Sequence, residues 1–218
     1  MYRYILFDLD GTLTDSGEGV VNCVKYALEK MGRPCLPEQE LKKFLGPPLQ
    51  DMFQELCGFT PEEAEEGIAF FRERYHVLGQ FENAAAPGAA ALLEELKSRG
   101  YVTALASSKP EHMCRVICER YGFEPWLDVI TGSPPESDWQ KADILRETMR
   151  RLGIAEGDLS QALMVGDRKY DVLGAAAFGM DCVGVEFFGY AEPDELKDAG
   201  AVAVVQTVEE LREYILSH

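Results

Sequence analysis

The motif FDLDGTLTDS, residues 7–16, indicates both the fold and the position of the functional site. It continues from Tyr2–Phe7, which has the near-continuous apolar character of a strand buried on both faces of a parallel sheet. Asp8 and Asp10 are spaced i, i+2, so on an extended chain their side chains point to the same side. Gly11 then allows the backbone to turn sharply. The sequence therefore predicts two carboxylates together at the carboxyl end of the first strand.

Further apolar runs alternate with amphipathic helical patterns along the chain. The predicted strands are Tyr2–Phe7, Val102–Ala106, Asp128–Thr131, Leu163–Val165, Cys182–Val185 and Val202–Val205. Three helices between them end before glycines that suit a helix C-terminus, namely Gly88–Arg99 before Gly100, Glu111–Tyr121 before Gly122 and Lys141–Leu152 before Gly153. This alternation predicts an α/β fold with a doubly wound parallel sheet.

One long segment after the first strand carries only helical patterns. Between residues 15 and 85 a first apolar helical face ends at Gly32, and helices are predicted over Pro37–Leu45, Leu49–Leu56 and Pro61–Leu78. Thr60 and Glu63 form a capping-box pattern at the start of the last of these. We therefore expect a catalytic core built from residues 1–14 and 86–218, with an all-helical domain, residues 15–85, inserted into it.

Polar side chains follow several of the predicted strands. The second strand runs into Ser107-Ser108-Lys109-Pro110, Lys141 opens the helix after the third, and the fourth runs into Gly166-Asp167-Arg168-Lys169-Tyr170-Asp171. Because ligands of parallel α/β sheets bind outside the carboxyl ends of the strands, we expect these side chains to gather beside Asp8 and Asp10.

Four neighbouring carboxylates, Asp8, Asp10, Asp167 and Asp171, would repel one another unless a cation lay among them. Oxygen ligands without histidine or cysteine suit Mg²⁺, which combines one or two carboxylates with water and substrate phosphate. A carboxylate is also a known nucleophile toward phosphate. The pattern therefore predicts phosphoryl transfer assisted by Mg²⁺.

These motifs resemble those of the haloacid dehalogenase superfamily of phosphatases. FDLDGTLTDS is similar to the first motif, Ser107 within ALASSKP to the second, Lys141 to the third and GDRKYD to the fourth, in the family's order. The helical insertion matches the cap domain that such enzymes carry after the first motif. FLGPPLQDMF and FRERYHVLGQFEN are similar to segments of the phosphoglycolate phosphatase-type branch.

The resemblance implies a phosphatase that hydrolyses a small-molecule phosphomonoester through an aspartyl-phosphate intermediate. Asp8 would be the nucleophile and a metal ligand. Asp10 would act as acid and then as base, with its backbone carbonyl on the metal. Ser107 and Lys141 would hold the phosphoryl oxygens. Asp167 would bind Mg²⁺, and Asp171 would bind either the metal or its waters.

The substrate contacts implied in the same way are Gly11, Thr12, Ser107, Ser108, Lys109, Lys141, Gly46 and Pro47. Lys109 and Arg168 are expected to contact the anion, although either is also consistent with an ordinary surface charge. Gly46 and Pro47 are equally consistent with a simple connection between two helices.

Several alternatives remain open. Sugar phosphomutases, pyrophosphatases and 5′-nucleotidases share the core motifs, so the core alone does not separate them from a phosphomonoesterase. The presence of Asp10 argues against a dehalogenase. A receiver domain phosphorylated on aspartate is a remoter alternative, since it has neither the helical insertion nor the Asp8/Asp10 pairing.

The composition limits partners and location. Acidic residues outnumber basic ones by 38 to 21, giving a net charge of −17, which disfavours nucleic acids and anionic membranes as partners. The N-terminus does not match a signal peptide, and the six cysteines form no CxxC pair. We expect a cytoplasmic protein that acts on a small phosphorylated metabolite, as a monomer or else a dimer. Phosphate affinity should collapse without divalent metal.

Overall fold

The computed structural model describes residues 1–135, 137 and 139–218. The chain divides into two compact units, one formed by Met1–Thr14 with Ala85–His218 and the other by Asp15–Ala84. In the described part of the chain no helix is both long enough and apolar enough to cross a membrane.

The first unit is built on a six-stranded parallel sheet, which confirms the predicted α/β class. In sheet order the strands are β5 (Val129–Ser133), β4 (Val102–Pro110), β1 (Tyr4–Phe7), β6 (Ala162–Gly166), β7 (Asp181–Val185) and β8 (Ala203–Val205). The chain moves from β1 outward to β4 and β5, then returns to the other side of β1 with β6. Such a reversal of strand order is where parallel α/β sheets place their ligands.

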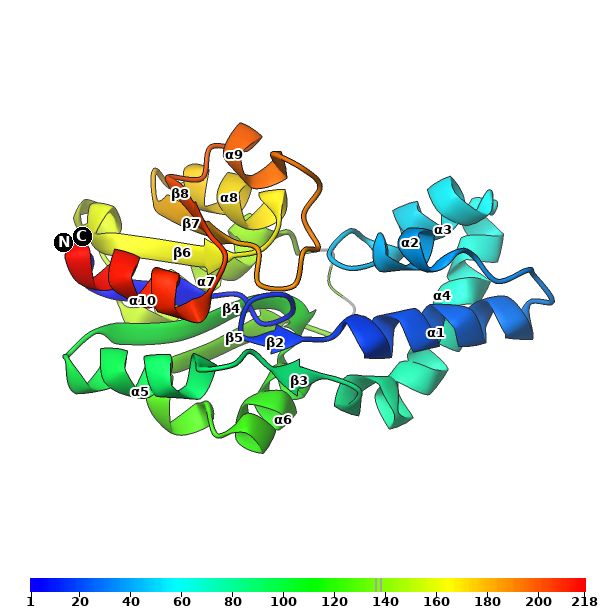
Figure 1. The fold of residues 1–218 in the computed structure, drawn as a ribbon, viewed down its shortest axis with the longest axis horizontal. Coiled ribbons are helices and arrows are strands. Elements are labelled where there is room, and N and C mark those ends of the chain that lie inside the picture. Colours follow the sequence, from blue (N-terminus) through cyan, green and yellow to red (C-terminus); the bar gives the residue numbers. More distant parts are fainter. Residues whose placement is uncertain (136, 138) are drawn as a thin grey trace. The chain divides into compact units, whose positions relative to one another are not determined.

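Both faces of this sheet are covered by helices, as Figure 1 shows. The helices are α5 (Ala89–Ser98), α6 (Glu111–Tyr121), α7 (Lys141–Leu152), α8 (Lys169–Ala176), α9 (Glu195–Asp198) and α10 (Val208–Ser217). Residues of β1 alternate between the two hydrophobic clusters: Ile5 and Phe7 pack with α5, α6 and α10, whereas Tyr4 and Leu6 pack with α7, α8 and α9. Because a strand has a side-chain period of two, this double covering explains why β1 is apolar throughout.

The element boundaries differ in places from those expected. β1 begins at Tyr4 instead of residue 2, and β8 begins at Ala203 instead of residue 202. β4 continues to Pro110, past the predicted end at Ala106, with a shift of register against β5 between those two residues. The helix C-termini at Gly100, Gly122 and Gly153 are as predicted, with φ of 88°, 70° and 69°.

The second unit is helical. It contains α1 (Gly17–Lys30), α2 (Glu38–Lys42), α3 (Leu49–Cys57), α4 (Pro61–Val77) and the short 3₁₀ helix η1 (Gly79–Phe81). The Thr60/Glu63 capping box is present at the start of α4. α2 is shorter than predicted, ending at Lys42. Gly19 of α1 is required by close packing, because a Cβ there would lie 2.2 Å from the Gly79 carbonyl oxygen.

Two short strands not predicted from the sequence lie where the chain passes between the units. β2 (Thr14–Asp15) and β3 (Ala84–Ala85) form a two-stranded sheet of their own. Each has only two residues, which is too short to leave an alternating pattern in the sequence.

Candidate active site

The sheet brings three of the predicted motifs to one edge. Phe7, the last residue of β1, is in register with Leu105 of β4 on one side and Val165 of β6 on the other. Asp8 follows directly after Phe7, and its backbone N–H donates to the Val165 carbonyl (2.9 Å). Ser107 and Asp167 lie two residues beyond Leu105 and Val165. The motifs therefore meet because β4 and β6 both flank β1.

Lys141 contacts carboxylates of both the first and the fourth motif. It is the first residue of α7, and its side chain is only 6% exposed. Its Nζ lies 2.8 Å from Asp8 Oδ1, 2.7 Å from Asp171 Oδ1 and 2.9 Å from the Ala106 carbonyl oxygen. Burial by itself lowers the pKa of Lys141, but the charges of Asp171 and Asp8 hold it above its ordinary value. Lys141 is therefore a buried, charged ammonium between two carboxylates.

A packing contact fixes the path of this lysine. A Cβ at Gly174, on α8, would lie 2.7 Å from Lys141 Cγ, so only glycine leaves room for the lysine stem at this crossing of α7 and α8. Gly174 lies outside the sequence motifs, and nothing in its neighbouring residues signals this contact.

Asp8, Asp167 and Asp171 form an acidic cluster in which Asp167 and Asp171 are buried and Asp8 is partly exposed. Each can offer a carboxylate oxygen such that the three atoms lie within 4.8 Å of one another. Burial raises the pKa of Asp8 to about 6, opposed by the nearby Lys141 and reinforced by Asp171. Burial, followed by the charges of Asp171 and Asp8, raises the pKa of Asp167 well above its ordinary value. Lys141 neutralises only one of three charges, so the cluster favours protons or another cation.

The turn after β1 is held by its own backbone. Gly11 N donates to the Thr14 carbonyl (2.7 Å), and the Leu9 carbonyl accepts from Leu13 N and Thr14 N, both at 2.9 Å. Gly11 has φ of 83°, and a Cβ there would lie 2.0 Å from Asp167 Oδ2. Gly11 is therefore required both for the turn and for the close approach of Asp167.

Replacing Gly11 with alanine should displace Asp167 as well as strain the turn. An L-residue in the left-handed region costs about 1–2 kcal/mol, and the added methyl group also overlaps the Asp167 carboxylate. Gly100→Ala is the matched control, because Gly100 has φ of 88° but open space around it. In urea denaturation both variants should lose stability, and only Gly11→Ala should also lose the increase in melting temperature caused by Mg²⁺. An equal Mg²⁺ response in the two variants would contradict this reading.

Asp10 and Lys109 form an ion pair at the same edge. Lys109 Nζ lies 2.5 Å from Asp10 Oδ2, and the lysine side chain is 8% exposed. Asp10 Oδ1 is buried without a hydrogen bond. The sequence suggested Lys109 as a contact for the substrate anion. In the structure its ammonium group holds the carboxylate expected to act as acid and base.

The other candidate residues are placed as follows. Ser107 is 2% exposed, and its Oγ accepts a hydrogen bond from Lys109 N (3.3 Å). Thr12 Oγ1 lies 3.5 Å from Asp167 Oδ1 and is buried, whereas Ser108 is exposed. Gly46 and Pro47 belong to the second unit, between α2 and α3.

Arg168 pairs with a residue outside the sequence motifs. Its guanidinium is paired with Glu195, with 2.9 Å between Nε and Oε1. The sequence offered no signal for this partner, which lies far along the chain in α9.

The acidic cluster has the properties of a Mg²⁺ site. Its donors are all oxygen atoms of carboxylates that lie close together. The Lys141 ammonium group offsets only part of their charge. Hard oxygen ligands at this density are those that Mg²⁺ prefers. Asp8, Asp167 and Asp171 are therefore the residues that fit the metal.

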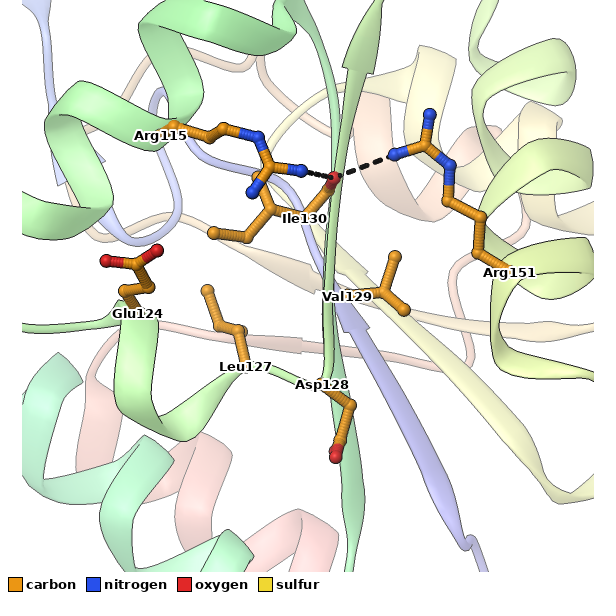
Figure 2. A pocket seen from close by; sticks show the side chains of 7 residues that line it. All are labelled: Arg115, Glu124, Leu127, Asp128, Val129, Ile130 and Arg151. Carbon is orange, nitrogen blue, oxygen red and sulfur yellow. Dashed lines mark hydrogen bonds between the residues drawn. The ribbon is translucent and has the colours of Figure 1, made fainter.

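A separate cavity of about 230 Å³ lies over the edge strand β5. Figure 2 shows Arg115 and Arg151 reaching the Ile130 carbonyl oxygen from opposite sides, at 3.5 and 3.1 Å. Both guanidinium groups also pair with Glu111, at 2.8 and 2.7 Å. Arg151 also pairs with Glu147 at 2.8 Å, so these two carboxylates balance the two guanidinium charges. None of the predicted site residues lines the cavity.

The chain is similar to known proteins over nearly its whole length. Residues 5–185 match the family model of the haloacid dehalogenase-like hydrolases. A 5′-nucleotidase of Pseudomonas aeruginosa is 36% identical over 100% of this chain and 97% of its own. The tyrosine-protein kinase PtkA of Mycobacterium tuberculosis is 37% identical over 97% of this chain and 72% of its own. A phosphoglycolate phosphatase of Cupriavidus necator is 29% identical over 95% and 90%.

The chain is also similar to solved structures of phosphatases. The crystal structure of a predicted phosphatase from Clostridium acetobutylicum superimposes with a TM-score of 0.90, at 40% identity and with 100% of both chains covered. The family model covers most of the chain, including the residues of all four motifs. The chain therefore belongs to the haloacid dehalogenase-like hydrolase family, as one of its phosphatases.

Proposed function

We propose that this protein is a Mg²⁺-dependent phosphatase that hydrolyses a small-molecule phosphomonoester by transferring the phosphoryl group to Asp8. The observation that carries the proposal is the position of Asp8, at the end of β1 within 2.8 Å of Lys141 and within the acidic cluster. A carboxylate so placed can attack phosphorus while neighbouring cations offset the charge that develops.

The proposed reaction has two steps, divided among residues of this chain. An Asp8 oxygen attacks phosphorus as the bond to the leaving-group oxygen breaks, and Asp10 donates a proton to that oxygen. Asp10, now a carboxylate, takes a proton from the water that attacks the phosphorus of the aspartyl phosphate. Phosphate leaves and Asp8 is regenerated.

The remaining residues orient and neutralise the phosphoryl group. Lys141 and Ser107 would hold its oxygen atoms, since Lys141 already lies beside Asp8 and Ser107 lies in β4 two residues beyond Leu105, the partner of Phe7. Mg²⁺, bound by Asp8, Asp167, the Asp10 carbonyl and either Asp171 or its waters, would supply further positive charge. Lys109 would keep the Asp10 carboxylate in place between the two steps.

The helical unit, Asp15–Ala84, is proposed to act as a cap that selects the substrate. This rests on its likeness to the caps of family members, including the segment around Gly46 and Pro47. Water exclusion by such a cap favours transfer to Asp8 over side reactions.

The proposed substrates are phosphoglycolate-like compounds, with nucleotides as a second candidate. The 36% identical relative named a 5′-nucleotidase favours the nucleotide, whereas the sequence motifs and the relative named phosphoglycolate phosphatase favour the smaller ester. Sugar phosphates are a third candidate for the same reaction.

A kinetic panel tests this proposal. Phosphate release should be measured with phosphoglycolate, nucleoside monophosphates, sugar phosphates and pyrophosphate, each with Mg²⁺ and with EDTA. We expect Mg²⁺-dependent release from at least one phosphomonoester. Sugar-phosphate isomerisation faster than phosphate release would favour a mutase instead, and a lack of Mg²⁺-dependent release across the panel would contradict the proposal.

The raised carboxylate pKa values predict how Mg²⁺ stabilisation depends on pH. Without metal, a carboxyl whose pKa rises from 3.8 to about 6 on folding, as for Asp8, stabilises the fold below pH 3.8. That contribution is lost as pH rises through about 6. The pKa of Asp167 is also raised, so its contribution has the same sign. Mg²⁺ needs the ionised carboxylates, so its binding strengthens over the same range.

The expected result is a larger Mg²⁺-induced rise in melting temperature at pH 8 than at pH 5. At a Mg²⁺ concentration one hundred times its Kd the stabilisation is about 2.7 kcal/mol. Because each comparison is made at one pH with and without Mg²⁺, titration of other groups cancels. Equal increases at the two pH values would show that these carboxylates do not hold the metal.

A further inference from the structure

The segment that carries Asp167 and, in the first turn of α8, Asp171 is anchored by an acidic residue from a distant part of the chain. Arg168, between the two aspartates, directs its guanidinium to Glu195 at the start of α9. The two side chains are only 10% and 7% exposed. Figure 1 shows α8 and α9 beside each other on one face of the sheet. Arg168 lies within the fourth sequence motif, whereas Glu195 lies outside all four motifs and beyond residue 185, where the family match ends.

The Glu195 carboxylate accepts hydrogen bonds from four nitrogen atoms. Arg168 Nε and Nη2 lie at 2.9 and 3.3 Å, the Lys169 backbone N at 2.9 Å and the Glu192 backbone N at 3.1 Å. Burial alone raises the pKa of Glu195, but the hydrogen bonds from Arg168, Lys169 and Glu192 hold it below its ordinary value. The carboxylate is therefore charged, and both of its oxygen atoms accept hydrogen bonds.

One of these donors belongs to the first turn of α8. Lys169 is the first residue of α8, and its N–H has no carbonyl partner within the helix. Arg168 N, one residue earlier, donates to Asp171 Oδ2 (3.1 Å). Glu195 thus holds the backbone at Lys169 and the side chain of Arg168, while the backbone of Arg168 holds Asp171.

The turn before Glu195 is built to present it. Glu195 N donates to the Glu192 carbonyl (3.0 Å), closing a turn that contains Pro193 and Asp194. Asp194 has φ of 60°, a left-handed conformation uncommon for a residue other than glycine. Such a conformation persists where the surrounding contacts over-determine it. Here the turn directs the Glu195 carboxylate back to Glu192 N and to the loop of Arg168.

We propose that Glu195 is a positioning residue for the metal site, acting through Arg168 and the first turn of α8 to hold Asp167 and Asp171 at their mutual spacing. The inference rests on the proposed function, because the metal is part of that proposal. Partners that orient ligands in this way typically change metal affinity about 10–100-fold when removed.

The simpler reading is that the pair only stabilises the fold. Both readings predict a lower melting temperature for Glu195→Gln, so stability alone does not separate them. Mg²⁺ affinity does, because a merely stabilising pair leaves the folded metal site unchanged.

The experiment compares Glu195→Gln and Arg168→Lys with Glu192→Gln, which removes a charge from the same turn at an exposed side chain. Mg²⁺ binding to the folded proteins is measured by calorimetry without substrate, alongside circular dichroism. Arg168→Lys keeps the charge but loses the two-pronged contact with Glu195. It provides a second route if Glu195→Gln does not fold.

We expect the Mg²⁺ Kd to rise about 10-fold or more in Glu195→Gln, less in Arg168→Lys, and not at all in Glu192→Gln. The kcat of Glu195→Gln should recover largely at saturating Mg²⁺. Unchanged Mg²⁺ Kd values in the folded Glu195 and Arg168 variants would overturn the positioning role while leaving the proposed function intact. No Mg²⁺ binding by the wild type would overturn both.

Discussion

Replacing Asp8 with asparagine is expected to abolish turnover, lowering kcat on the order of 10⁴-fold or more. The amide has nearly the same shape as the carboxylate but is not a nucleophile toward phosphorus. Asp8 lies 2.8 Å from Lys141, and asparagine retains an oxygen that can accept from that ammonium. The fold should therefore survive, and the loss should appear in kcat measured with any accepted phosphomonoester.

The control for this variant removes an aspartate charge that is not part of the acidic cluster. Asp51, exposed on α3 of the helical unit, is suitable, and Asp51→Asn should keep wild-type kinetics. Circular dichroism and thermal melting should show both variants folded. An Asp8→Asn enzyme that turns over within a few-fold of wild type would assign the chemistry to another group.

Replacing Asp10 with asparagine should slow turnover by about 10²–10⁴-fold and change which step limits the rate. Asp10 is proposed to give a proton to the leaving group and to take one from water. p-Nitrophenyl phosphate has a leaving group that departs without protonation, so transfer to Asp8 should still proceed with this substrate. Hydrolysis of the aspartyl phosphate still needs a base, so the second step should stall.

The expected signature is a burst of about one p-nitrophenol per enzyme followed by slow release. The Asp8→Asn/Asp10→Asn double variant should lose the burst. Steady turnover at the wild-type rate in Asp10→Asn would remove Asp10 from the acid–base role. A uniformly slow reaction without a burst would mean that Asp10 acts mainly in the first step.

Much of the core could be predicted because its pattern is local. The strands around Phe7, Leu105 and Val165 are apolar on both faces, and this places the polar residues after them at one edge of a parallel sheet. The helix-ending glycines have positive φ for the same local reason. The exact strand end at Pro110 could not be predicted, because Ser107, Ser108 and Lys109 have no strong strand preference. They lie in a register shift against β5, and only Pro110 beyond them pairs again, with Ser133.

The contacts made by Lys109, Gly174 and Glu195 depend on tertiary structure, and no local sequence pattern indicates them. Lys109 and Asp10 are distant in sequence, and only the adjacency of β1 and β4 brings them together as an ion pair. Gly174 contacts Lys141 because α7 and α8 pack on the same face of the sheet. Glu195 reaches Arg168 through a turn whose left-handed residue is Asp194. Because glycine is the usual residue in that conformation, the sequence does not mark this turn.

If the phosphoryl group is transferred to Asp8, the phosphorylated enzyme can be trapped and its modified residue identified. Asp10→Asn should be mixed with p-nitrophenyl phosphate and Mg²⁺, quenched in acid after a few milliseconds to seconds, digested and analysed by mass spectrometry. We predict one added phosphoryl group on the peptide containing Asp8, absent with EDTA and absent when Asp8 is also replaced by asparagine. A p-nitrophenol burst with the phosphoryl group on another residue, or turnover with no phosphorylated peptide at any time, would contradict the account.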